Sequence, residues 1–228
     1  MSKVIWITGA SAGIGEATAY EFAKDKNVKL VLSARRLEEL ERVKENVNLP
    51  KQNILILPMD VTKIELFEEN VKQVISAFGR IDVLFNNAGI SQRGSVAESK
   101  FENYRTIMEI NFFGVVALTQ AVLPIMLKQK SGNIAVTSSV SGKLGTPMRS
   151  GYCASKHALH GFFDSLRAEV WRENVHVTLI CPGYIKTDIS KNAITADGEK
   201  HGKMDKNQEK GLSAADCAVR IVNAIKIN

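Results

Sequence analysis

Cysteine is scarce in this chain: its 228 residues include only Cys153, Cys181 and Cys217. None belongs to a Cys-x-x-Cys pair or lies near histidines at zinc-ligand spacing, so we expect neither a disulfide framework nor a metal site. Unpaired cysteines are typical of a reducing compartment. The apolar run near the amino terminus is too short for the core of a signal peptide. The protein is therefore expected to be cytoplasmic.

Long hydrophobic runs are lacking as well. The longest, residues 112–127, is interrupted by Gly114, Gln120 and Pro124. It also falls short of the ~18–20 residues that a membrane span needs. We predict a buried helix here and no integral membrane segment.

Acidic residues are the minority charge: 24 of them face 30 lysines and arginines, which gives a net charge of +6. This balance fits a nucleic-acid binder or an enzyme of phosphorylated ligands. Nucleic-acid binding would need a basic patch whose affinity falls steeply with salt. Because no element interleaves basic and aromatic residues, we expect a small-molecule partner and no nucleic acid.

Short apolar runs alternate with amphipathic stretches along the chain. The predicted strands are residues 4–7, 29–33, 53–57, 81–85, 133–138 and 175–180, and the predicted helices are residues 14–24, 37–47, 63–78, 101–130, 152–171 and 214–225. Such alternation predicts parallel strands joined by right-handed crossovers. The strands are nearly all apolar, as in a sheet buried on both faces. We predict one α/β domain over residues 1–228, a doubly wound parallel sheet with helices on both faces.

One segment departs from this pattern. Residues 186–211, between the sixth strand and the last helix, are polar and rich in lysine, acids and asparagine. Loops of this length are commonly lids or disordered. We predict an extended lid loop here.

The turn after the first predicted strand is rich in glycine. Residues 8–15 read Thr-Gly-Ala-Ser-Ala-Gly-Ile-Gly, with glycines at Gly9, Gly13 and Gly15. Glycines let the backbone approach a pyrophosphate at the positive end of the following helix. A tight turn alone would also use glycine. Its position in a strand–turn–helix unit favours the nucleotide role.

The end of the second predicted strand bears on the choice of dinucleotide. An NAD enzyme would place an acid there for the adenosine 2′-hydroxyl, whereas an arginine accommodates a 2′-phosphate. This chain has Arg35 and Arg36 and no acid, which predicts NADP(H) with Arg35 as the first choice; the alternative is two solvated arginines at a strand end. Asp60 and Val61 follow the third strand and either contact adenine or cap the next helix.

Tyr152 and Lys156 lie four residues apart on a predicted helix, so their side chains share one face. Lowering a tyrosine pKa by about three units takes roughly 4 kcal/mol, which a unit charge at about 4 Å supplies at an effective dielectric near 20. Lys156 could therefore make Tyr152 a working general acid or base. Taken alone, Tyr-x-x-x-Lys is frequent by chance.

The chain resembles the short-chain dehydrogenase/reductase family from residue 3 to about residue 225. The motifs that carry the resemblance, in the family's order and spacing, are residues 8–15, Asn86-Asn87-Ala88-Gly89, Asn111, Ser139, Tyr152-x-x-x-Lys156 and Pro182-Gly183-x-x-x-Thr187. The resemblance implies a single-domain Rossmann fold and an oxidoreductase that transfers hydride between nicotinamide and a carbonyl or secondary alcohol.

The resemblance also implies a catalytic tetrad of Asn111, Ser139, Tyr152 and Lys156. In it the tyrosine protonates the carbonyl oxygen and the serine hydrogen-bonds that oxygen. The lysine lowers the tyrosine pKa and holds the nicotinamide ribose, and the asparagine holds a water in the proton relay. Ser139 is preferred to its serine neighbours because the family's serine lies thirteen residues before the tyrosine.

The predicted cofactor contacts combine the residue pattern with the resemblance, which places residues 87–89 along the cofactor cleft and residues 182–187 beside the nicotinamide amide. They are Gly9, Ser11, Gly13, Ile14, Gly15, Arg35, Arg36, Asp60, Val61, Asn87, Ala88, Gly89, Tyr152, Lys156, Pro182, Gly183, Ile185 and Thr187. An alternative on the same fold is a non-catalytic, dinucleotide-sensing regulatory protein. A lost tetrad residue would favour that alternative, and none is lost.

More narrowly, residues 91–94, 149–152 and 192–198 resemble the branch that contains dehydrogenase/reductase member 7B, which implies a lipophilic substrate. The family implies a homodimer or homotetramer that associates through residues 101–130 and 152–171. The usual seventh strand of the family is absent after the last predicted helix, so we expect either a truncated chain or an altered subunit interface.

Two histidines follow the Tyr–Lys pair on the same predicted helix. His157 and His160 are interpreted as surface or interface groups, because no carboxylate or cysteine partner lies at metal spacing. Cys153 is expected to be a small packed side chain rather than a nucleophile.

Overall fold

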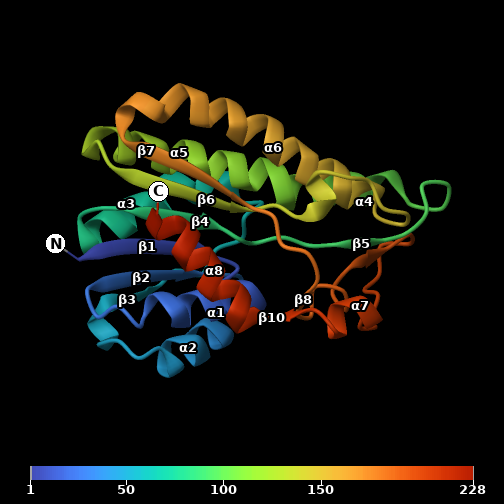
Figure 1. Cartoon of the computed structure of the whole chain (residues 1–228), viewed down its shortest axis with the longest axis horizontal. Helices are drawn as coiled ribbons and strands as arrows, with labels where there is room; N and C mark the ends of the chain where they lie inside the picture. Colours follow the sequence, from blue (N-terminus) through green and yellow to red (C-terminus); the bar gives the residue numbers. More distant parts are fainter. Residues whose placement is uncertain (1, 228) are drawn as a thin grey trace.

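The apolar runs of the sequence form one parallel sheet in the computed structural model, which describes residues 2–227 (Figure 1). Its strands are β1 (Lys3–Thr8), β2 (Val28–Ser33), β3 (Ile54–Ile56), β4 (Val83–Asn86), β6 (Gly132–Thr137) and β7 (Val175–Ile180). They lie in the order β3-β2-β1-β4-β6-β7, and every neighbouring pair is parallel.

Helices cover both faces of this sheet (Figure 1). One layer contains α1 (Gly13–Phe22), α2 (Leu37–Asn46) and α8 (Ala214–Ile227), and the other contains α3 (Phe67–Phe78), α5 (Gly114–Gln129) and α6 (Ser150–Val170), with α4 (Phe101–Met108) beyond the sheet edge. Short 3₁₀ turns lie at Lys51–Asn53, Ile64–Leu66, Val140–Gly142 and Trp171–Glu173. The helix predicted from residue 63 thus begins as a 3₁₀ turn.

Each strand contributes apolar side chains to both layers because successive residues point to opposite faces. In β1, Ile5 and Ile7 pack against α1 and α8, whereas Trp6 packs on the side of α3 and α5. The indole Nε1 of Trp6, which is fully buried, donates to Ser33 Oγ at 2.9 Å. The predicted fold class, a doubly wound parallel sheet of the Rossmann type, is confirmed.

The strand order reverses between β1 and β4. From β1 the chain builds outward through β2 and β3, then returns to place β4, β6 and β7 on the other side. Ligands of open α/β sheets bind at such a reversal, beyond the carboxyl ends of the strands. The fold therefore locates the candidate site before any side chain is considered.

The helix predicted over residues 101–130 is not uniform, which corrects the sequence prediction. It contains a π-helical turn at Glu109–Phe113, between α4 and α5. By length and composition alone, residues 101–129 could cross a membrane. In the fold, Val115, Leu118 and Val122 of this helix are buried in the core on the sheet, as predicted for a buried helix.

The 186–211 segment has more regular structure than the predicted loop. It includes β9 (Ile194–Thr195) and α7 (Lys206–Glu209), and it is flanked by β8 (Ile185–Lys186) and β10 (Leu212–Ser213). β8 pairs with β10, and β9 pairs with β5 (Gln92–Arg93). The segment is thus tied down beside the carboxyl ends of the strands (Figure 1).

Two helical glycines give opposite predictions for replacement by alanine. A Cβ on Gly114 would lie 2.2 Å from the backbone oxygen of Val61, whereas one on Gly161 would meet nothing within 4 Å. Gly114→Ala should lower the free energy of unfolding by about 1–3 kcal/mol through overpacking. Gly161→Ala should raise it by about 0.5–1 kcal/mol, because alanine favours the helix. Urea unfolding of both variants measures this; equal effects would show that the approach at Val61 is not tight.

Candidate active site

The floor of the site is the contact between the carboxyl ends of β1 and β4. Thr8 Oγ1 accepts the backbone N–H groups of Asn87 at 2.9 Å and Ala88 at 3.1 Å. The Asn87 amide donates to the carbonyl oxygens of Thr8 and Gly9. A Cβ on Gly9 would lie 2.9 Å from the Ala88 Cα. Glycine is therefore required where the two strand ends meet.

The glycine-rich turn opens onto the amino-terminal end of α1. Gly13 begins the helix with φ +57°, a conformation that favours glycine, and a Cβ there would lie 3.1 Å from the methyl carbon of Thr187. Gly15 packs on the backbone of the turn, where a Cβ would lie 2.3 Å from Gly9 O. No side chain caps α1 at Ala12. Its first N–H groups are thus available to an anion.

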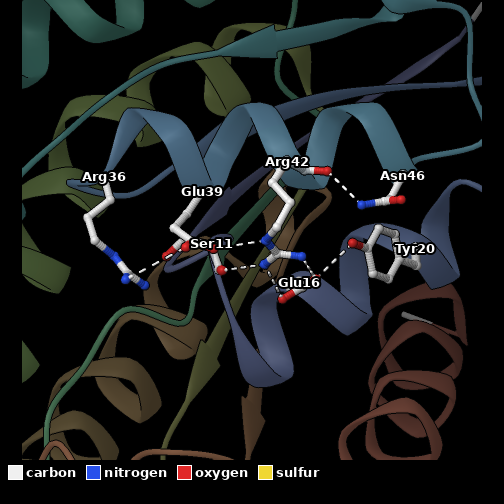
Figure 2. Close-up of polar contacts among 7 residues, drawn as sticks. All are labelled: Ser11, Glu16, Tyr20, Arg36, Glu39, Arg42 and Asn46. Atoms are coloured by element: carbon white, nitrogen blue, oxygen red, sulfur yellow. Dashed lines mark hydrogen bonds and ion pairs between the residues drawn. The ribbon is translucent and has the colours of Figure 1, made fainter.

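An ionic cluster supports this turn from the side of α2 (Figure 2). Arg42 donates to both carboxylate oxygens of Glu16, at 2.7 and 3.0 Å, and to Glu39 Oε2 at 2.9 Å. The same guanidinium donates to the carbonyl oxygen of Ser11 at 3.1 Å. Burial alone would raise the pKa of Glu16, but the bonds from Arg42 and Tyr20 outweigh it and lower that pKa. Arg42 therefore links α1, α2 and the glycine turn.

A cleft of about 820 Å³ runs along the carboxyl edge of the sheet past this turn. Of the predicted contacts, those that line it are Gly9, Ser11, Gly13, Ile14, Arg35, Arg36, Asp60, Val61, Asn87, Ala88, Gly89, Tyr152, Lys156 and Thr187. Its lining also includes Lys186, Lys191 and Lys200 from the loop beyond β7, against two acids, Asp60 and Asp188. The cleft is therefore electropositive and suited to an anionic ligand.

Arg35 and Arg36 lie at one end of the cleft. Both are exposed, and Arg36 Nη1 lies 4.0 Å from Glu39 Oε1. Asp60 Oδ1 accepts the backbone N–H and the hydroxyl of Thr62, each at 2.9 Å. Burial would raise the pKa of Asp60, but the Thr62 bonds and the charge of Arg35 lower it. Asp60 thus caps its own turn and still faces the cleft.

Tyr152 and Lys156 form the opposite end. Lys156 Nζ donates to the carbonyl oxygen of Thr137 at 2.7 Å and lies 5.7 Å from the centroid of the Tyr152 ring. Thr137 Oγ1 in turn donates to Asn87 Oδ1 at 3.1 Å. Both Tyr152 and Lys156 are buried. The lysine is therefore fixed to the end of β6, which Asn87 links to the floor.

Burial dominates the ionisation of this pair. It raises the pKa of Tyr152, which a hydrogen bond from Ser139 and the charge of Arg149 partly offset. It lowers the pKa of Lys156 to about 8. The sequence predicts that Lys156 lowers the tyrosine pKa; in this structure the loss of solvation outweighs any such effect, because neither group is exposed to water.

Asn111 lies behind the wall of the cleft, in the π-helical turn. Its Oδ1 accepts the N–H of Ile90 at 2.9 Å, and its Nδ2 donates to Ile90 O at 2.9 Å and to Ser155 Oγ at 3.1 Å. π-turns are rare and often occur at functional sites. Here the turn brings a fully buried amide against the irregular segment that follows β4, at Gly89 and Ile90.

The serines after β6 have different partners. Ser139 is the one bonded to Tyr152, whereas Ser138 Oγ lies 3.0 Å from Nε2 of His160. His160 is buried, with 9% of its surface exposed, and burial lowers its pKa. The prediction of a surface or interface position is therefore wrong for His160, because α6 turns this residue into the fold, toward the end of β6.

Four predicted cofactor contacts do not line the cleft. Gly15 lies behind the glycine turn. Ile185 is buried in the core with α1 and α8, and its carbonyl oxygen accepts from Gln208 Nε2 at 2.7 Å. Pro182 and Gly183 lie just before it, and Pro182 O accepts the N–H of Val140 at 3.1 Å. Their contribution is to hold the backbone that positions Thr187.

Gln92 is a functional residue that no motif of the sequence indicates. This side chain is fully buried, and its Oε1 accepts the N–H groups of Gly151 at 2.7 Å and Tyr152 at 3.3 Å. It thus caps the helix that carries Tyr152, from a segment sixty residues earlier. No local pattern signals such a cap. Arg42 was missed too, although its spacing from Glu39 indicates a pair on α2.

The part of the chain that the structure describes holds no group of three histidine, cysteine or acidic side chains placed to bind a metal.

A model of the short chain dehydrogenase family matches residues 3–198. The chain belongs to the short-chain dehydrogenase/reductase (SDR) family. It is therefore an SDR oxidoreductase by descent, on the fold described above.

Curated SDR relatives agree over nearly the whole chain. Dehydrogenase/reductase SDR family protein 7-like of Drosophila melanogaster is 43% identical over 227 residues, which cover 98% of this chain and 69% of that protein. Human dehydrogenase/reductase SDR family member 7 is 43% identical over 219 residues, 94% of this chain and 64% of that protein. Mouse member 7B is 43% identical over 229 residues, 98% of this chain and 70% of that protein. The predicted resemblance to the branch of member 7B is confirmed.

Solved SDR structures share the fold. An SDR from Burkholderia phymatum in complex with NAD has a TM-score of 0.87 and 27% identity, covering 99% of this chain and 86% of its own. An alcohol dehydrogenase from Thermococcus sibiricus complexed with 5-hydroxy-NADP has a TM-score of 0.84 and 29% identity, with coverages of 100% and 92%. Levodione reductase has a TM-score of 0.87 and 30% identity, with coverages of 98% and 90%.

The buried ammonium of this SDR protein predicts a pH-dependent stability difference. Below pH 8 Lys156 is charged in both the folded and unfolded states, so folding bears the full cost of its desolvation. Between the folded-state pKa of about 8 and the ordinary lysine pKa of 10.5, the folded state loses the proton first and the cost fades. The stability of Lys156→Met relative to wild type should therefore fall by about 2–3 kcal/mol between pH 7 and pH 10.

Urea unfolding at both pH values measures this difference. Lys128→Met, at an exposed position on α5, is the matched control and should show no such change. A Lys156→Met difference that stays constant with pH would mean that the ammonium is not desolvated.

Proposed function

We propose that this SDR protein is an NADP(H)-dependent oxidoreductase that acts on a carbonyl or secondary alcohol. One observation carries the proposal. Tyr152, Ser139 and Lys156 converge at one end of a continuous cleft, and Arg35 and Arg36 lie at the other end with the glycine turn between them. A dinucleotide extended along this cleft would bring its reactive ring to the tyrosine.

The residues of the cleft fit such a ligand. The close approach of Gly13 to Thr187 leaves no room for a side chain where the backbone would contact a pyrophosphate. The uncapped end of α1 supplies N–H groups and a positive dipole. Lys186, Lys191 and Lys200 add positive charge along the same wall. These features together favour a polyanionic ligand.

When bound, nicotinamide would supply the hydride acceptor or donor of the reaction. The chain itself supplies position and proton transfer. Tyr152 would donate a proton to the substrate oxygen from its hydroxyl, and Ser139 would hydrogen-bond that oxygen. Because burial raises the pKa of Tyr152, the phenol is protonated at neutral pH and can act as the acid.

Lys156 and Asn111 would support this proton transfer. With a pKa of about 8, most Lys156 side chains are charged at pH 7, which stabilises the phenolate left after the proton moves. Asn111 fixes the backbone at Ile90 and, by family resemblance, would hold a water of the relay. These assignments rest on the resemblance and on the positions of the side chains.

The preference for NADP(H) over NAD(H) rests on the arginine end of the cleft. The described relatives do not decide it, since one solved neighbour is a complex with NAD and another with 5-hydroxy-NADP. Two features of this chain favour the 2′-phosphate: Arg35 and Arg36 line the cleft, and no acid follows β2 where a ribose hydroxyl would need one.

A lipophilic substrate is supported by the side chains around Ser139 and Tyr152. Val140, Leu144 and Met148 lie on the loop between these two residues, and Tyr184 lies on the loop after β7. All four are large, apolar or aromatic, and exposed. Exposed apolar groups of this size favour contact with an apolar ligand.

Association and location stay predictions. Phe112 of the π-helical turn and Phe162 of α6 pack edge to face, with ring centroids 6.2 Å apart, and Phe113 beside them is half exposed. This surface supports the proposed homodimer or homotetramer through the two long helices. Free Cys153, Cys181 and Cys217 are consistent with the proposed cytoplasmic location.

Calorimetric titration with NADPH and NADH tests the cofactor. We expect NADPH to bind at least tenfold more tightly, a difference of about 1.4 kcal/mol. Arg35→Ala should remove that margin by weakening NADPH alone. Arg105→Ala, an exposed arginine on α4, is the matched control and should preserve it. Equal affinities for the two cofactors in the wild type would refute the NADP preference.

Turnover of a panel of lipophilic ketones and aldehydes tests the catalytic assignment. Tyr152→Phe should reduce the rate about 10²–10⁴-fold, because the proton donor is lost, while NADPH binding stays within a few-fold of wild type. NADPH binding by the wild type without turnover of any carbonyl or alcohol would favour the dinucleotide-sensing alternative.

A further inference from the structure

Three separate segments meet at the amino-terminal end of α6, just before Tyr152. They are β5 with the residues that follow it, the loop that contains Met148, and the 186–211 segment. β5 supplies Gln92, which caps the N–H groups of Gly151 and Tyr152. The backbone N–H of Gly94 donates to Met148 O at 3.0 Å. The third segment is the 186–211 segment, whose β9 pairs with β5. Movement of any one of them would therefore be transmitted to the tyrosine.

An ion cluster joins the same three segments. Asp205 Oδ2, in the 186–211 segment, pairs with Arg149 Nη2 at 2.9 Å and with Arg93 Nη2. The side chains of both arginines are only 16% exposed, and that of Asp205 is 22% exposed. Ion pairs buried to this degree are screened far less than surface pairs. Two guanidinium groups thus depend on one carboxylate.

The ion cluster forms in place of the interactions that are usual at the N-caps of α6 and α7. Asp205 occupies the N-cap of α7, where an aspartate ordinarily accepts a backbone N–H of the first turn, yet its side chain makes no capping bond. Arg149 occupies the N-cap of α6, at the positive end of the helix dipole, where a cation is unfavourable. Asp205 therefore compensates a charge that the helix end does not favour.

Through Arg149, which lies three residues before Tyr152, this cluster can act on the reacting group. The charge of Arg149 lowers the pKa of Tyr152, against the larger effect of burial. Burial and the charge of Arg149 lower the pKa of Arg93 to about 10. The titratable and charged groups that the contacts bring to this end of α6 are Arg93, Tyr104, Arg149, Cys153, Lys156, Tyr184 and Asp205.

The same contact fixes one wall of the cleft. Met204, next to Asp205, lines the cleft together with Lys200. Ser190 Oγ lies 3.3 Å from the backbone N of Asp205 and 3.3 Å from the Met204 sulfur. Holding Asp205 in place therefore also holds Met204 against the ligand space.

We propose that Asp205 is a positioning residue that docks the 186–211 segment on Arg93 and Arg149 and thereby sets the electrostatic field at Tyr152. It rests on the proposed function only in taking Tyr152 as the proton donor. Docking and field are measurable without substrate or cofactor, so failure of the cofactor assignment would leave both measurements interpretable.

The field is tested by titrating the Tyr152 phenol through its near-ultraviolet phenolate absorbance. Each variant is compared with the same variant carrying Tyr152→Phe, which isolates this tyrosine from the other three. Asp205→Asn removes a negative charge and should lower the pKa of Tyr152 by roughly half a unit or more. Arg149→Gln removes a positive charge and should raise it. General loosening of the fold would shift both variants in the same direction.

Docking is tested by hydrogen exchange measured with mass spectrometry. Asp205→Asn should speed exchange within residues 186–211 several-fold and leave β1 and β4 unchanged. Glu199→Gln, an exposed acid in the same segment, is the matched control and should change neither exchange nor titration. Faster exchange without a shift of the Tyr152 titration would reduce Asp205 to a tether and overturn the proposal, as would wild-type behaviour in both measurements.

Discussion

The contact between the carboxyl ends of β1 and β4 is the constraint on which the rest of the site depends. Thr8 accepts two backbone N–H groups from the residues just after β4, and the Asn87 side chain donates to the carbonyl oxygens of Thr8 and Gly9. Asn87 also accepts from Thr137, whose own carbonyl oxygen holds Lys156. A single chain of polar contacts thus runs from the glycine turn to the lysine. The two ends of the cleft are built on one support.

Burial has opposite consequences for folding and for chemistry at the Tyr152 end. Removing water from Lys156 makes its charged form costly, yet the same exclusion strengthens every charge that acts on the phenol. The Thr137 carbonyl offsets part of this cost for Lys156, and the hydrogen bond from Ser139 offsets part of the cost of ionising Tyr152. Functional sites commonly contain such locally unfavourable arrangements, supported by the surrounding structure.

The sequence predicted what depends on local pattern. The alternation of apolar runs and amphipathic stretches gave all six sheet strands, and the glycine spacing and the Tyr–Lys spacing placed two ends of one cleft. It could not predict contacts between distant segments. The cap by Gln92 joins residues 59 positions apart. The pairing of Arg42 with Glu16 spans 26 positions, and buried His160 meets Ser138 across 22 positions. The π-helical turn was missed because apolar periodicity continues through it.

That π-helical turn divides one continuous helix into two halves that pack against different elements. Its extra residue rotates α4 relative to α5, so α4 faces α6 while α5 lies against α3 and β6. Residues 109–113 therefore contain one residue more than regular α-helical winding would need, which amounts to an insertion inside a helix. Loss of one residue there would restore regular winding and turn the Asn111 amide away from Ile90 by about 100°. The length of this helix, and not only its composition, is thus part of the site.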